Sequence, residues 1–456
     1  MKKLILVIAG GVAAACFSLG AAAALQIQSW TLDNGARVLF VENHSIPIID
    51  LNVDLDAGSR REPAGKAGLA LLTNAMLARG VHEARFSDDG RAPQAEMALE
   101  PALTEAQISD AFADTAAQRG GGADSERANV SLRSLSSAPE RTAAVRLLAR
   151  ILAQPSFPQE FLERDKARTI AGIKEDLTKP EAIAGKAFWH VLYGSHPYAN
   201  EATIESVAAI TRDDIALFHR THYVANRAVV SIIGDLTRAE AEDIARQLTL
   251  RLPQGAPLPQ MPTVPEARAQ LRRIAHPASQ AHILIGMPSE VRGDPDFFAL
   301  TVGNYILGGG GFVSRLTNEV REKRGLTYGV YSAFSPMAQK GPFQIGLQTK
   351  KESAEQALKV VNATLAAFLR DGPTPDEMQA AKDNLIGSFP LRLDNNRKIL
   401  GNVALIGFYG LPLDYLDTWT ANIAKVSIAD VRAAFRRKVA LDQLSTVIVG
   451  ASASAP

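Results

Sequence analysis

The sequence contains only one cysteine, Cys16, in 456 residues. A single thiol forms no internal disulfide and supplies no multi-thiolate metal site. Because Cys16 lies in the apolar segment that opens the chain, the remainder of the protein also lacks a cysteine nucleophile. The cysteine content therefore excludes a disulfide scaffold, a thiolate metal centre and cysteine-dependent catalysis.

The chain also has almost no net charge and few aromatic residues. Its 49 Lys and Arg residues balance 48 Asp and Glu residues, and aromatic residues make up 6% of the composition. No basic patch interleaved with aromatic residues occurs, so the composition does not indicate binding to nucleic acid or to an anionic membrane surface. A hydrophobic fraction of 46% is ordinary for a globular protein. At about 150–250 residues per domain, the length predicts two domains.

A long apolar run occurs at the start of the chain, where two lysines precede an apolar stretch that ends in small residues. Glycines interrupt this stretch too early for a membrane span, and the pattern is typical of a secretory signal peptide. We predict a signal peptide at 1–24, cleaved near Ala22–Ala24, and a periplasmic location. The alternative is a lipoprotein anchored through Cys16, although Ala13 stands where leucine usually precedes the lipidated cysteine.

Two pairs of segments repeat at one offset. The segments 211–236 and 427–452 each begin with Ser or Thr, carry an Asp three residues on, and continue as an amphipathic helix and a β-branched strand that ends in Gly. The segments 154–173 and 371–390 each combine prolines, an acidic helix start and a lysine. Each half is predicted to have the order strand, helix, helix, helix, strand. Chance similarity is the alternative, but two matches at one offset favour a tandem duplication of one α+β domain.

The segment 252–270 is rich in Pro and polar residues and has no apolar period, which is typical of a linker. It separates a first domain, 25–251, from a second domain, 271–456. Near the start of each domain an alternating strand pattern precedes a helix. Because the spacing of these elements differs between the halves, we expect an insertion at 82–108.

Three segments of the chain resemble the M16 zinc peptidases, the pitrilysin, insulin-degrading and mitochondrial-processing group. They are LDNGARVLFVENHSIPIIDLNVDLDAGSRREPAGKAGLA, the HPYA turn at 196–199, and LGGGGFVSRLTNEVREKRGLTYGVYSAF at 307–334. The last matches the family pattern at nearly every position. The resemblance covers essentially all of the mature chain. It implies an α+β fold of two LuxS-like, metallohydrolase-type domains, each an antiparallel-rich sheet with helices packed on one face.

The helix predicted at 68–80, GLALLTNAMLARG, carries no charged side chain before Arg79. In active family members Gly-Leu-Ala is followed by His-x-x-Glu-His, whose histidines bind zinc and whose glutamate activates water. Here these positions hold Leu71, Asn74 and Ala75. The family's third ligand, a glutamate, aligns near Gly172, and Glu175 lies one register away from a useful face. Since a catalytic zinc needs about three protein ligands, we predict no metal and no cofactor in this chain.

Five histidines are candidates for a replacement metal site: His82, His190, His196, His219 and His222. His219 and His222 form HRTH, which has no nearby Glu or Cys and no histidine counterpart in the second half. We interpret the five as surface or capping residues. For His190, the bulky apolar neighbours in 183–193 favour a packed, hydrogen-bonded side chain.

The segment SRLTNEVREKRG predicts a helix that ends at Gly325, and TYGVYSAF predicts a strand. Arg321 falls in the last helical turn, and Tyr328 lies seven residues later at the start of the strand. By resemblance, this pair reaches across to the zinc site of a facing half. Tyr328 would donate a hydrogen bond to the oxyanion of the tetrahedral intermediate, and Arg321 would hold a main-chain carbonyl of the substrate. An arginine favoured by the helix dipole and a structural tyrosine are the alternatives.

Two glycine-rich segments are further candidates for peptide binding. Gly308, Gly309, Gly310 and Gly311 form either a flexible turn or exposed backbone near the internal chamber of the family. The segment 119–136 matches the region where active members present an edge strand to substrate, although its glycines weaken the strand propensity.

Some bacterial members of this family work as pairs, in which one chain carries the zinc motif and the other keeps the Arg and Tyr. The resemblance therefore implies a catalytically incomplete subunit of an exported heterodimeric M16 zinc peptidase. Its partner would be an active M16 subunit that holds Zn, and its substrate an unfolded peptide. No peptidase activity is expected of this chain alone. The alternative is a non-catalytic scaffold or peptide-binding protein of the same fold.

Overall fold

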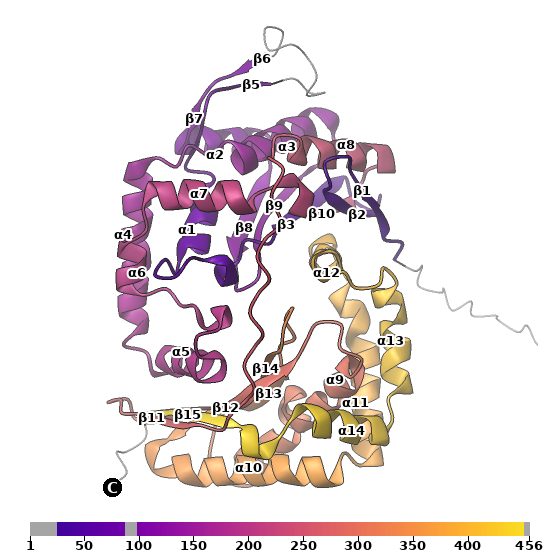
Figure 1. Ribbon diagram of the computed structural model, residues 1–456. Coiled ribbons are helices and arrows are strands. Elements are labelled where there is room, and N and C mark those ends of the chain that lie inside the picture. Colours follow the sequence, from indigo (N-terminus) through magenta and orange to yellow (C-terminus); the bar gives the residue numbers. More distant parts are fainter. Residues whose placement is uncertain (1–24, 87–97, 451–456) are drawn as a thin grey trace, which may run out of the picture.

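The computed structural model describes residues 25–86 and 98–450. Helices and strands build two lobes, one above the other in Figure 1, and each lobe contains one main sheet. The prediction of an α+β fold is thereby confirmed. The predicted signal peptide 1–24, including Cys16, lies outside the described residues. Within the described part of the chain, no helix combines the length and apolarity needed to span a membrane.

The first lobe has a six-stranded sheet with the strand order β1-β2-β10-β3-β9-β8. β2 and β10 are parallel, and the other neighbours are antiparallel. In Figure 1, α3 and α8 cover the outer face of this sheet. The elements are β1 (Gln28–Thr31), β2 (Arg37–Glu42), β3 (Ile48–Leu55), α1 (Leu69–Met76), α2 (Glu105–Asp114), β8 (Gln118–Ala123), β9 (Ala128–Leu135), α3 (Ala138–Ala153), α4 (Gln159–Asp176), α5 (Pro180–Tyr193), α6 (Ile204–Ala208), α7 (Arg212–His222), β10 (Val229–Gly234) and α8 (Arg238–Thr249).

The second lobe has a five-stranded sheet with the order β11-β15-β12-β14-β13, in which only β11 and β15 are parallel. α10 lies beneath this sheet in Figure 1. The elements are β11 (Leu271–Ile274), β12 (Gln280–Glu290), α9 (Phe297–Asn304), β13 (Val330–Phe334), β14 (Gly341–Lys350), α10 (Ala354–Asp371), α11 (Pro375–Ser388), α12 (Asn396–Tyr409), α13 (Tyr415–Lys425), α14 (Ile428–Lys438) and β15 (Ser445–Val449).

The two sheets have the same strand order and directions once β1 is set aside, as a duplication requires. β2, β10, β3, β9 and β8 correspond to β11, β15, β12, β14 and β13. Five helices, α3–α7, lie between β9 and β10, and five, α10–α14, lie between β14 and β15, rather than the three predicted for each half. The three predicted helices correspond to α3, α4 and α7 in the first half and to α10, α11 and α14 in the second, so the count left out α5 and α6 in one half and α12 and α13 in the other.

The residues that repeat in the sequence play the same part in both lobes. Asp214 and Asp430 each complete a capping box at the start of a helix, α7 and α14. Lys166 donates a hydrogen bond of 2.9 Å to a carbonyl at the end of α6. Lys382 donates one of 2.7 Å to the corresponding carbonyl near the end of α13. The matched lysines therefore fasten matched pairs of helices, which explains why both recur at one offset.

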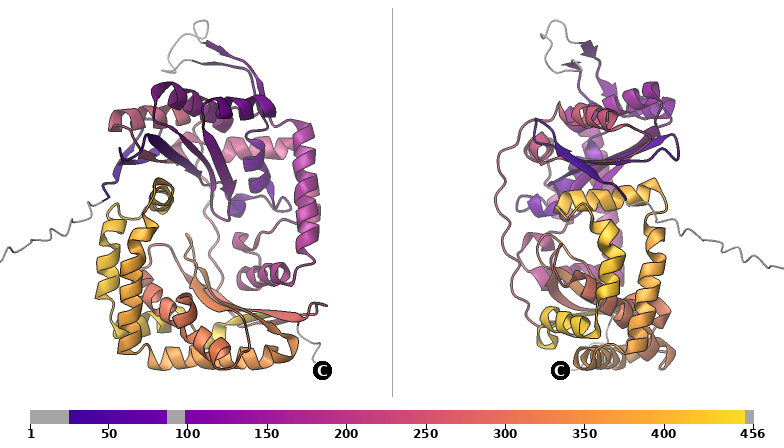
Figure 2. Two further views of the ribbon diagram at one scale, coloured as in Figure 1. Left: turned by 180° about the vertical axis from the view of Figure 1, so that it is seen from behind. Right: turned by 90° about the vertical axis from the view of Figure 1, so that its right-hand side faces the viewer.

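One helix of each lobe lies on the sheet of the other lobe. α12 packs against β2, β3 and β10, and α5 packs against β12 and β15 (Figures 1 and 2). Glycines allow the close approach: a Cβ at Gly407 would lie 2.7 Å from a Val229 methyl, and a Cβ at Gly286 would lie 2.8 Å from Phe188 Cζ. The hydrophobic cores of the two lobes are consequently shared across the interface.

The segment between α8 and β11 contains no helix or strand after residue 252 and runs down the molecule from one lobe to the other (Figure 2). It is held along its length. Arg61 Nη1 donates to the Pro259 carbonyl (2.8 Å), and Gln339 Nε2 donates to the Pro262 carbonyl (2.7 Å). The segment therefore contacts both lobes.

A hairpin projects from the first lobe within the segment 82–108, where an insertion was expected. Its strands are β5 (Ala84–Phe86) and β6 (Ala98–Glu100), and they lie at the top of Figure 1. Beneath it, β4 (Gly80–Val81) pairs with β7 (Leu103–Thr104). The second lobe has no hairpin between α9 and β13 among its described residues.

Gly234 and Gly172 are expected to respond oppositely to alanine. Gly234 has φ +148° and ends β10, where a Cβ would lie 2.3 Å from the Ile48 carbonyl oxygen. Gly172 lies inside α4, and a Cβ at this position would have no other atom within 4 Å. We expect Gly234→Ala to lower the free energy of unfolding by more than about 1 kcal/mol, and Gly172→Ala to raise it by about 0.5–1 kcal/mol. Urea denaturation of both variants measures the two effects, and equal changes would contradict the backbone argument.

Candidate functional site

The three positions of the family's zinc motif lie on α1, and their side chains do not form a metal site. Leu71 is 47% exposed and presents only carbon to the surface. Asn74 is buried, and its Nδ2 donates a 3.0 Å hydrogen bond to the Asn129 carbonyl of β9. Ala75 has no ligand atom beyond its backbone. Asn74 therefore fastens α1 to the sheet, and the set does not fit zinc.

The place of the family's third ligand is equally unsuited to a metal. Gly172 and Glu175 are exposed on α4. The Glu175 carboxylate pairs with Lys179 Nζ at 2.8 Å within the same chain segment, at the end of α4. Within residues 25–86 and 98–450, no group of three or more His, Cys, Asp or Glu side chains is arranged to hold a metal ion.

Three of the five candidate histidines are buried. His196 is a capping residue as predicted, because its Nδ1 accepts from the Tyr198 N–H at 3.1 Å. For His219 and His222 the prediction of a surface or capping position was wrong. His219 Nε2 lies 2.7 Å from the Leu152 carbonyl, His222 Nδ1 lies 3.1 Å from the Asp56 carbonyl, and His196 Nε2 lies 2.9 Å from the Pro262 carbonyl. Burial lowers the pKa of His219 and of His222 to about 4. These side chains are neutral packing residues that bond to main-chain carbonyls.

His82 and His190 are exposed. The prediction that His190 is packed was therefore wrong. On a helix, residues two positions apart in the sequence are separated by about 200° around the axis. Because Phe188 faces the shared core of the lobes, His190 lies on the opposite side of α5.

Glu62 holds the start of α1 in place of a side-chain cap. Its Oε1 accepts hydrogen bonds from the backbone N–H groups of Gly68 (3.0 Å) and Ala70 (2.8 Å). Gly68 precedes α1 with φ +100°, a conformation that favours glycine. Burial nevertheless raises the pKa of the Glu62 carboxyl to about 7.

This pKa predicts a pH-dependent stability. A carboxyl whose pKa is about 7 when folded and about 4.5 when unfolded binds more protons in the folded state, so its contribution falls as pH rises from about 4.5 to above 7. We expect Glu62→Gln to remove this dependence. The difference in unfolding free energy between the variant and the wild type should shift by about 2–3 kcal/mol in favour of the variant between pH 5 and pH 8. Urea denaturation at both pH values tests this, and a constant difference would contradict it.

Tyr328 is exposed, and hydrogen bonds hold the residues on either side of it, Thr327 and Gly329. Its side chain is 80% exposed and lies two residues before β13, so the strand starts later than predicted. On one side of it, Thr327 Oγ1 lies 2.7 Å from the Gln348 carbonyl of β14 and accepts from the Gly329 N–H at 3.0 Å. The phenol is thus presented to the surface from a restrained backbone.

Arg321 lies in the helical segment before Tyr328, as predicted. This segment is a π-helix over Thr317–Glu322, and Gly325 follows it with φ +59°. The Arg321 guanidinium lies 4.7 Å from the centre of the Phe312 ring, an aromatic side chain that is 71% exposed. Its Nε lies 3.5 Å from Glu322 Oε1. The stacking keeps the guanidinium near the surface, where further donors are available to a bound group.

The four glycines differ in their surroundings. Gly308 is buried, and a Cβ there would lie 2.5 Å from the backbone nitrogen of Ser332 on β13. Cβ atoms at Gly309 and Gly310 would meet Asn304 and Tyr305. Gly311 has φ +61° and nothing within 4 Å of a Cβ. The first three glycines therefore permit close packing of this turn against α9 and β13, and Gly311 permits the bend that presents Phe312.

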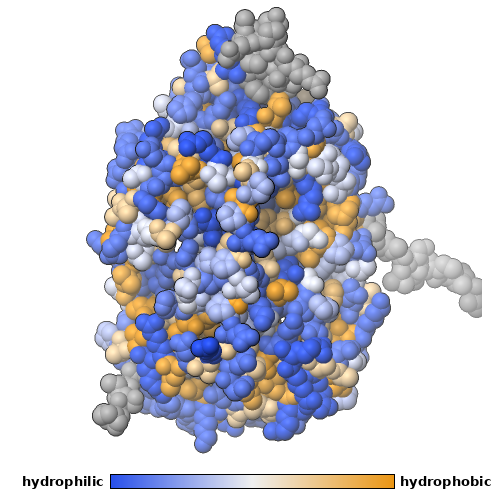
Figure 3. All heavy atoms as spheres, in the orientation of Figure 1, coloured by the Kyte–Doolittle hydropathy of each residue, from blue (hydrophilic) through white to orange (hydrophobic). Residues whose placement is uncertain are grey.

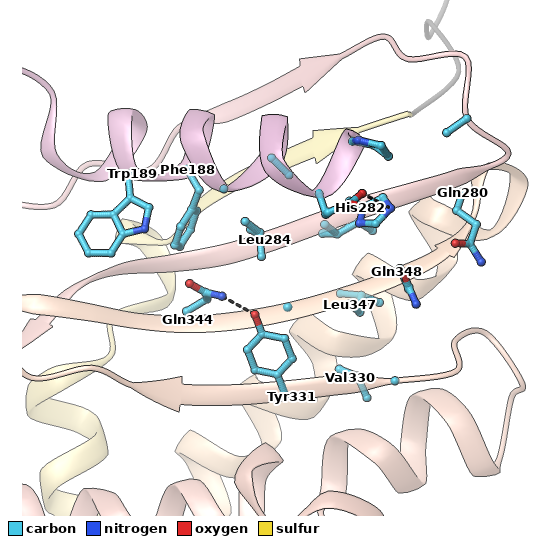
Figure 4. Close-up of a pocket in the computed structure, with 18 of the residues that line it drawn as sticks. Phe188, Trp189, Gln280, His282, Leu284, Val330, Tyr331, Gln344, Leu347 and Gln348 are labelled. Carbon is cyan, nitrogen blue, oxygen red and sulfur yellow. Dashed lines mark hydrogen bonds and ion pairs between the residues drawn. The ribbon is translucent and has the colours of Figure 1, made fainter. Parts of the chain in front are cut away.

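A groove of about 1000 Å³ is lined by residues that include Val330 and Tyr331 of β13 (Figure 4). Its walls are α5 and the strands β12, β14 and β13, and Gly329 directly follows Tyr328 into its lining. Tyr331 OH accepts a 2.5 Å hydrogen bond from Gln344 Nε2, and a Cβ at Gly346 would lie 2.6 Å from the Tyr331 ring. The groove was not predicted. Its apolar walls are Phe188, Trp189, Leu284, Val330, Tyr331 and Leu347.

The groove has features that suit an extended peptide. Its apolar side chains come from α5 and from three strands of the sheet. The outer edge of β13 is covered at Ser332, where Asn304 Nδ2 donates to the carbonyl at 3.1 Å and Gly308 packs against the backbone nitrogen. Apolar pockets of this kind take the side chains of an extended peptide. Figure 3 shows apolar residues among hydrophilic ones on the lower lobe, at the level of α5 and this sheet. The corresponding edge strand of the first lobe is β8, which overlaps the predicted segment 119–136.

The HPYA turn has a structural role that the sequence did not reveal. Tyr198 OH donates a 2.6 Å hydrogen bond to Glu126, a buried carboxylate at the β8–β9 turn. Glu126 also contacts Arg60, accepts a 2.6 Å bond from Tyr409 OH of α12, and accepts from the Ala338 N–H of the second lobe (3.1 Å). Burial raises the pKa of both tyrosines. Glu126 thus joins the two lobes.

Comparison with known proteins agrees with this geometry. The family model described as "Peptidase M16 inactive domain" matches residues 209–385. The crystal structure of a peptidase M16 inactive domain from Pseudomonas fluorescens superposes with a TM-score of 0.86 at 37% identity, covering 95% of this chain and 99% of that chain. The Helicobacter pylori protein named "Non-peptidase homolog YmxG" is 26% identical over 418 residues, 90% of this chain and 91% of the relative. The Bacillus subtilis protein named "Uncharacterized zinc protease YmxG" is 24% identical, over 82% of this chain and 87% of the relative.

The chain therefore belongs to the M16 peptidase family. Within it, the similarity to an inactive domain and the residues on α1 identify a protein of M16 fold that lacks the family's catalytic zinc site.

Proposed function

We propose that this protein is the non-zinc subunit of an exported heterodimeric M16 peptidase. The observation that carries the proposal is the contrast between the lobes. α1 of the first lobe has lost the ligands, whereas the second lobe presents Tyr328 and Arg321 at the surface beside a groove of about 1000 Å³. A chain that served only as a scaffold has no need of an exposed, restrained phenol at this place.

In the proposed complex, the second lobe faces the zinc-bearing lobe of an active M16 subunit. The Tyr328 hydroxyl donates a hydrogen bond to the oxyanion that forms when the peptide carbonyl is attacked. The Arg321 guanidinium donates to a main-chain carbonyl of the substrate and so fixes its register. Donors placed in advance at a developing oxyanion each contribute about 3–4 kcal/mol of transition-state stabilisation.

The groove beside Tyr328 holds the unfolded peptide on its way to that site. The peptide lies extended along the groove, and its apolar side chains enter between α5 and β14. The N-terminal segment directs the chain to the periplasm. Anchoring through Cys16 is the alternative location.

A second candidate function is a peptide-binding protein with no catalytic contribution, which the groove alone supports. One experiment separates the two. A fluorogenic unfolded peptide is incubated in three separate assays. The first contains this chain, the second contains an M16 chain with an intact His-x-x-Glu-His motif encoded next to it, and the third contains the mixture of both. We expect hydrolysis only in the mixture. Equal hydrolysis by the zinc-bearing chain alone would remove the catalytic role and leave the peptide-binding function.

A further inference from the structure

A second cavity, of about 400 Å³, lies between the two lobes and is separate from the groove beside Tyr328. Its lining combines residues of both halves of the chain. The first lobe supplies two arginines and one carboxylate, and the second lobe supplies one arginine and two aromatic rings. These charged and aromatic lining residues are Asp56, Arg60, Arg227, Arg292, Phe408 and Tyr409.

Each of the three arginines has an Nε atom that is buried and has no hydrogen-bond partner within the described chain. The Arg60 side chain is 8% exposed, so this donor has been removed from bulk water. Burying an N–H group without an acceptor is unfavourable, because the group loses its hydrogen bond to water. These Nε atoms are enclosed by protein, so a ligand in the cavity would pair with the guanidinium groups through their Nη atoms.

The charges around the cavity are not balanced. Asp56 is engaged by Arg61, through contacts of 3.0 and 2.6 Å, and by Arg60 Nη2 at 3.1 Å. Among the described residues, Arg227 and Arg292 form no ion pair within 4.0 Å. Arg227 and Arg292, one from each lobe, therefore lack a carboxylate at ion-pair distance, although Asp56 interacts electrostatically with Arg227 and Glu290 with Arg292.

These two arginines are held in place by neutral groups. Arg227 donates to the main-chain carbonyls of Thr221 and Ala256. Arg292 Nη2 donates to the Pro336 carbonyl at 2.8 Å, and its guanidinium lies 5.0 Å from the centre of the Tyr409 ring. Both guanidinium groups are thus positioned in advance, without a carboxylate at ion-pair distance.

We propose that this cavity is an oxyanion-binding site that links the lobes. Its ligand is a phosphate or carboxylate group, because guanidinium N–H donors pair with these groups through charge-assisted hydrogen bonds. The aromatic rings and the volume also admit a small organic body attached to the anion, such as one terminal residue of a peptide. Since the donors come from both lobes, binding stabilises the arrangement of one lobe on the other.

The test uses the full mature chain and two classes of anion. Inorganic phosphate is titrated by calorimetry, in parallel with an acetylated tripeptide that ends in phenylalanine with a free carboxylate and with the same peptide amidated. We expect phosphate to bind and to raise the melting temperature. Competition between phosphate and the acid peptide, but not the amide, assigns the site to peptide carboxylates. Binding of phosphate alone assigns it to phosphate groups.

Arg292→Gln is the decisive variant, and Arg397→Gln is its matched control. Arg397 is an exposed arginine on α12, so its replacement removes the same charge away from the cavity. We expect Arg292→Gln to weaken phosphate binding at least about tenfold and Arg397→Gln to leave it unchanged. If the glutamine variant does not fold, Arg292→Lys takes its place in the test. This variant keeps the positive charge but loses the planar guanidinium group, so we expect it to bind phosphate with intermediate affinity. No binding of either anion to the wild type, or equal binding to wild type and a folded Arg292 variant, would overturn the proposal.

Discussion

Tyr328→Phe is expected to lower peptide hydrolysis by the mixture of this chain and its zinc-bearing partner about a hundredfold. The substitution removes one hydroxyl from a side chain that is 80% exposed and lies outside the hydrophobic core of its lobe. Folding and assembly of the two chains should therefore be unaffected. The loss should fall on kcat, because the hydroxyl acts on charge that develops only in the transition state.

Tyr415→Phe is the matched control for this measurement. It removes a phenol hydroxyl from α13 of the same lobe, outside the groove and the Arg321–Tyr328 region. The control should hydrolyse the fluorogenic peptide at the wild-type rate. A Tyr328→Phe mixture that also keeps the wild-type rate would show that the phenol does not serve catalysis, and the peptide-binding function would stand.

Glu126→Ala is expected to lower the free energy of unfolding by about 3–5 kcal/mol. The substitution leaves the Arg60 guanidinium, the hydroxyls of Tyr198 and Tyr409, and the Ala338 N–H without their shared acceptor. All four are at the contact of the lobes, and the cost includes a buried guanidinium that loses one of its two carboxylate partners, Glu126, and keeps only Asp56. The measurement is urea denaturation followed by circular dichroism.

Glu355→Ala provides the comparison. Glu355 also pairs with an arginine, Arg273, but its side chain is 65% exposed. An exposed ion pair contributes about 0–1 kcal/mol, so this variant should unfold close to the wild type. If Glu126→Ala lost no more stability than Glu355→Ala, the buried carboxylate would not be the link between the lobes.

The sequence predicted the α+β class, the internal repeat and the absence of zinc ligands, because each depends on local chemistry. Thr211 and Ser427 are each followed three residues later by an aspartate, which is a local signal for the start of a helix. In both lobes the two side chains form a capping box, at the start of α7 and of α14. The identity of Leu71 needs no structure to exclude metal binding. The helix that ends near Arg321 was likewise predicted from its own residues and from the glycine that follows.

Features that depend on distant partners were not predicted. The positions of α5 and α12 on the opposite sheets result from packing between lobes, and no local pattern in either helix records the exchange. Glu126 is one acidic residue in a turn, and its partners lie far along the chain. The error at His190 has the same origin. The apolar residues that flank it in sequence do not surround it in space, because the helix places Phe188 and His190 on opposite faces.

If the first lobe holds no zinc, hydrolysis requires another chain. The direct measurement is the zinc content of the purified chain after incubation with zinc and desalting, combined with a peptide hydrolysis assay with and without a chelator. We predict far less than one equivalent of zinc and no hydrolysis. About one equivalent of zinc per chain, together with hydrolysis that the chelator abolishes, would contradict the account.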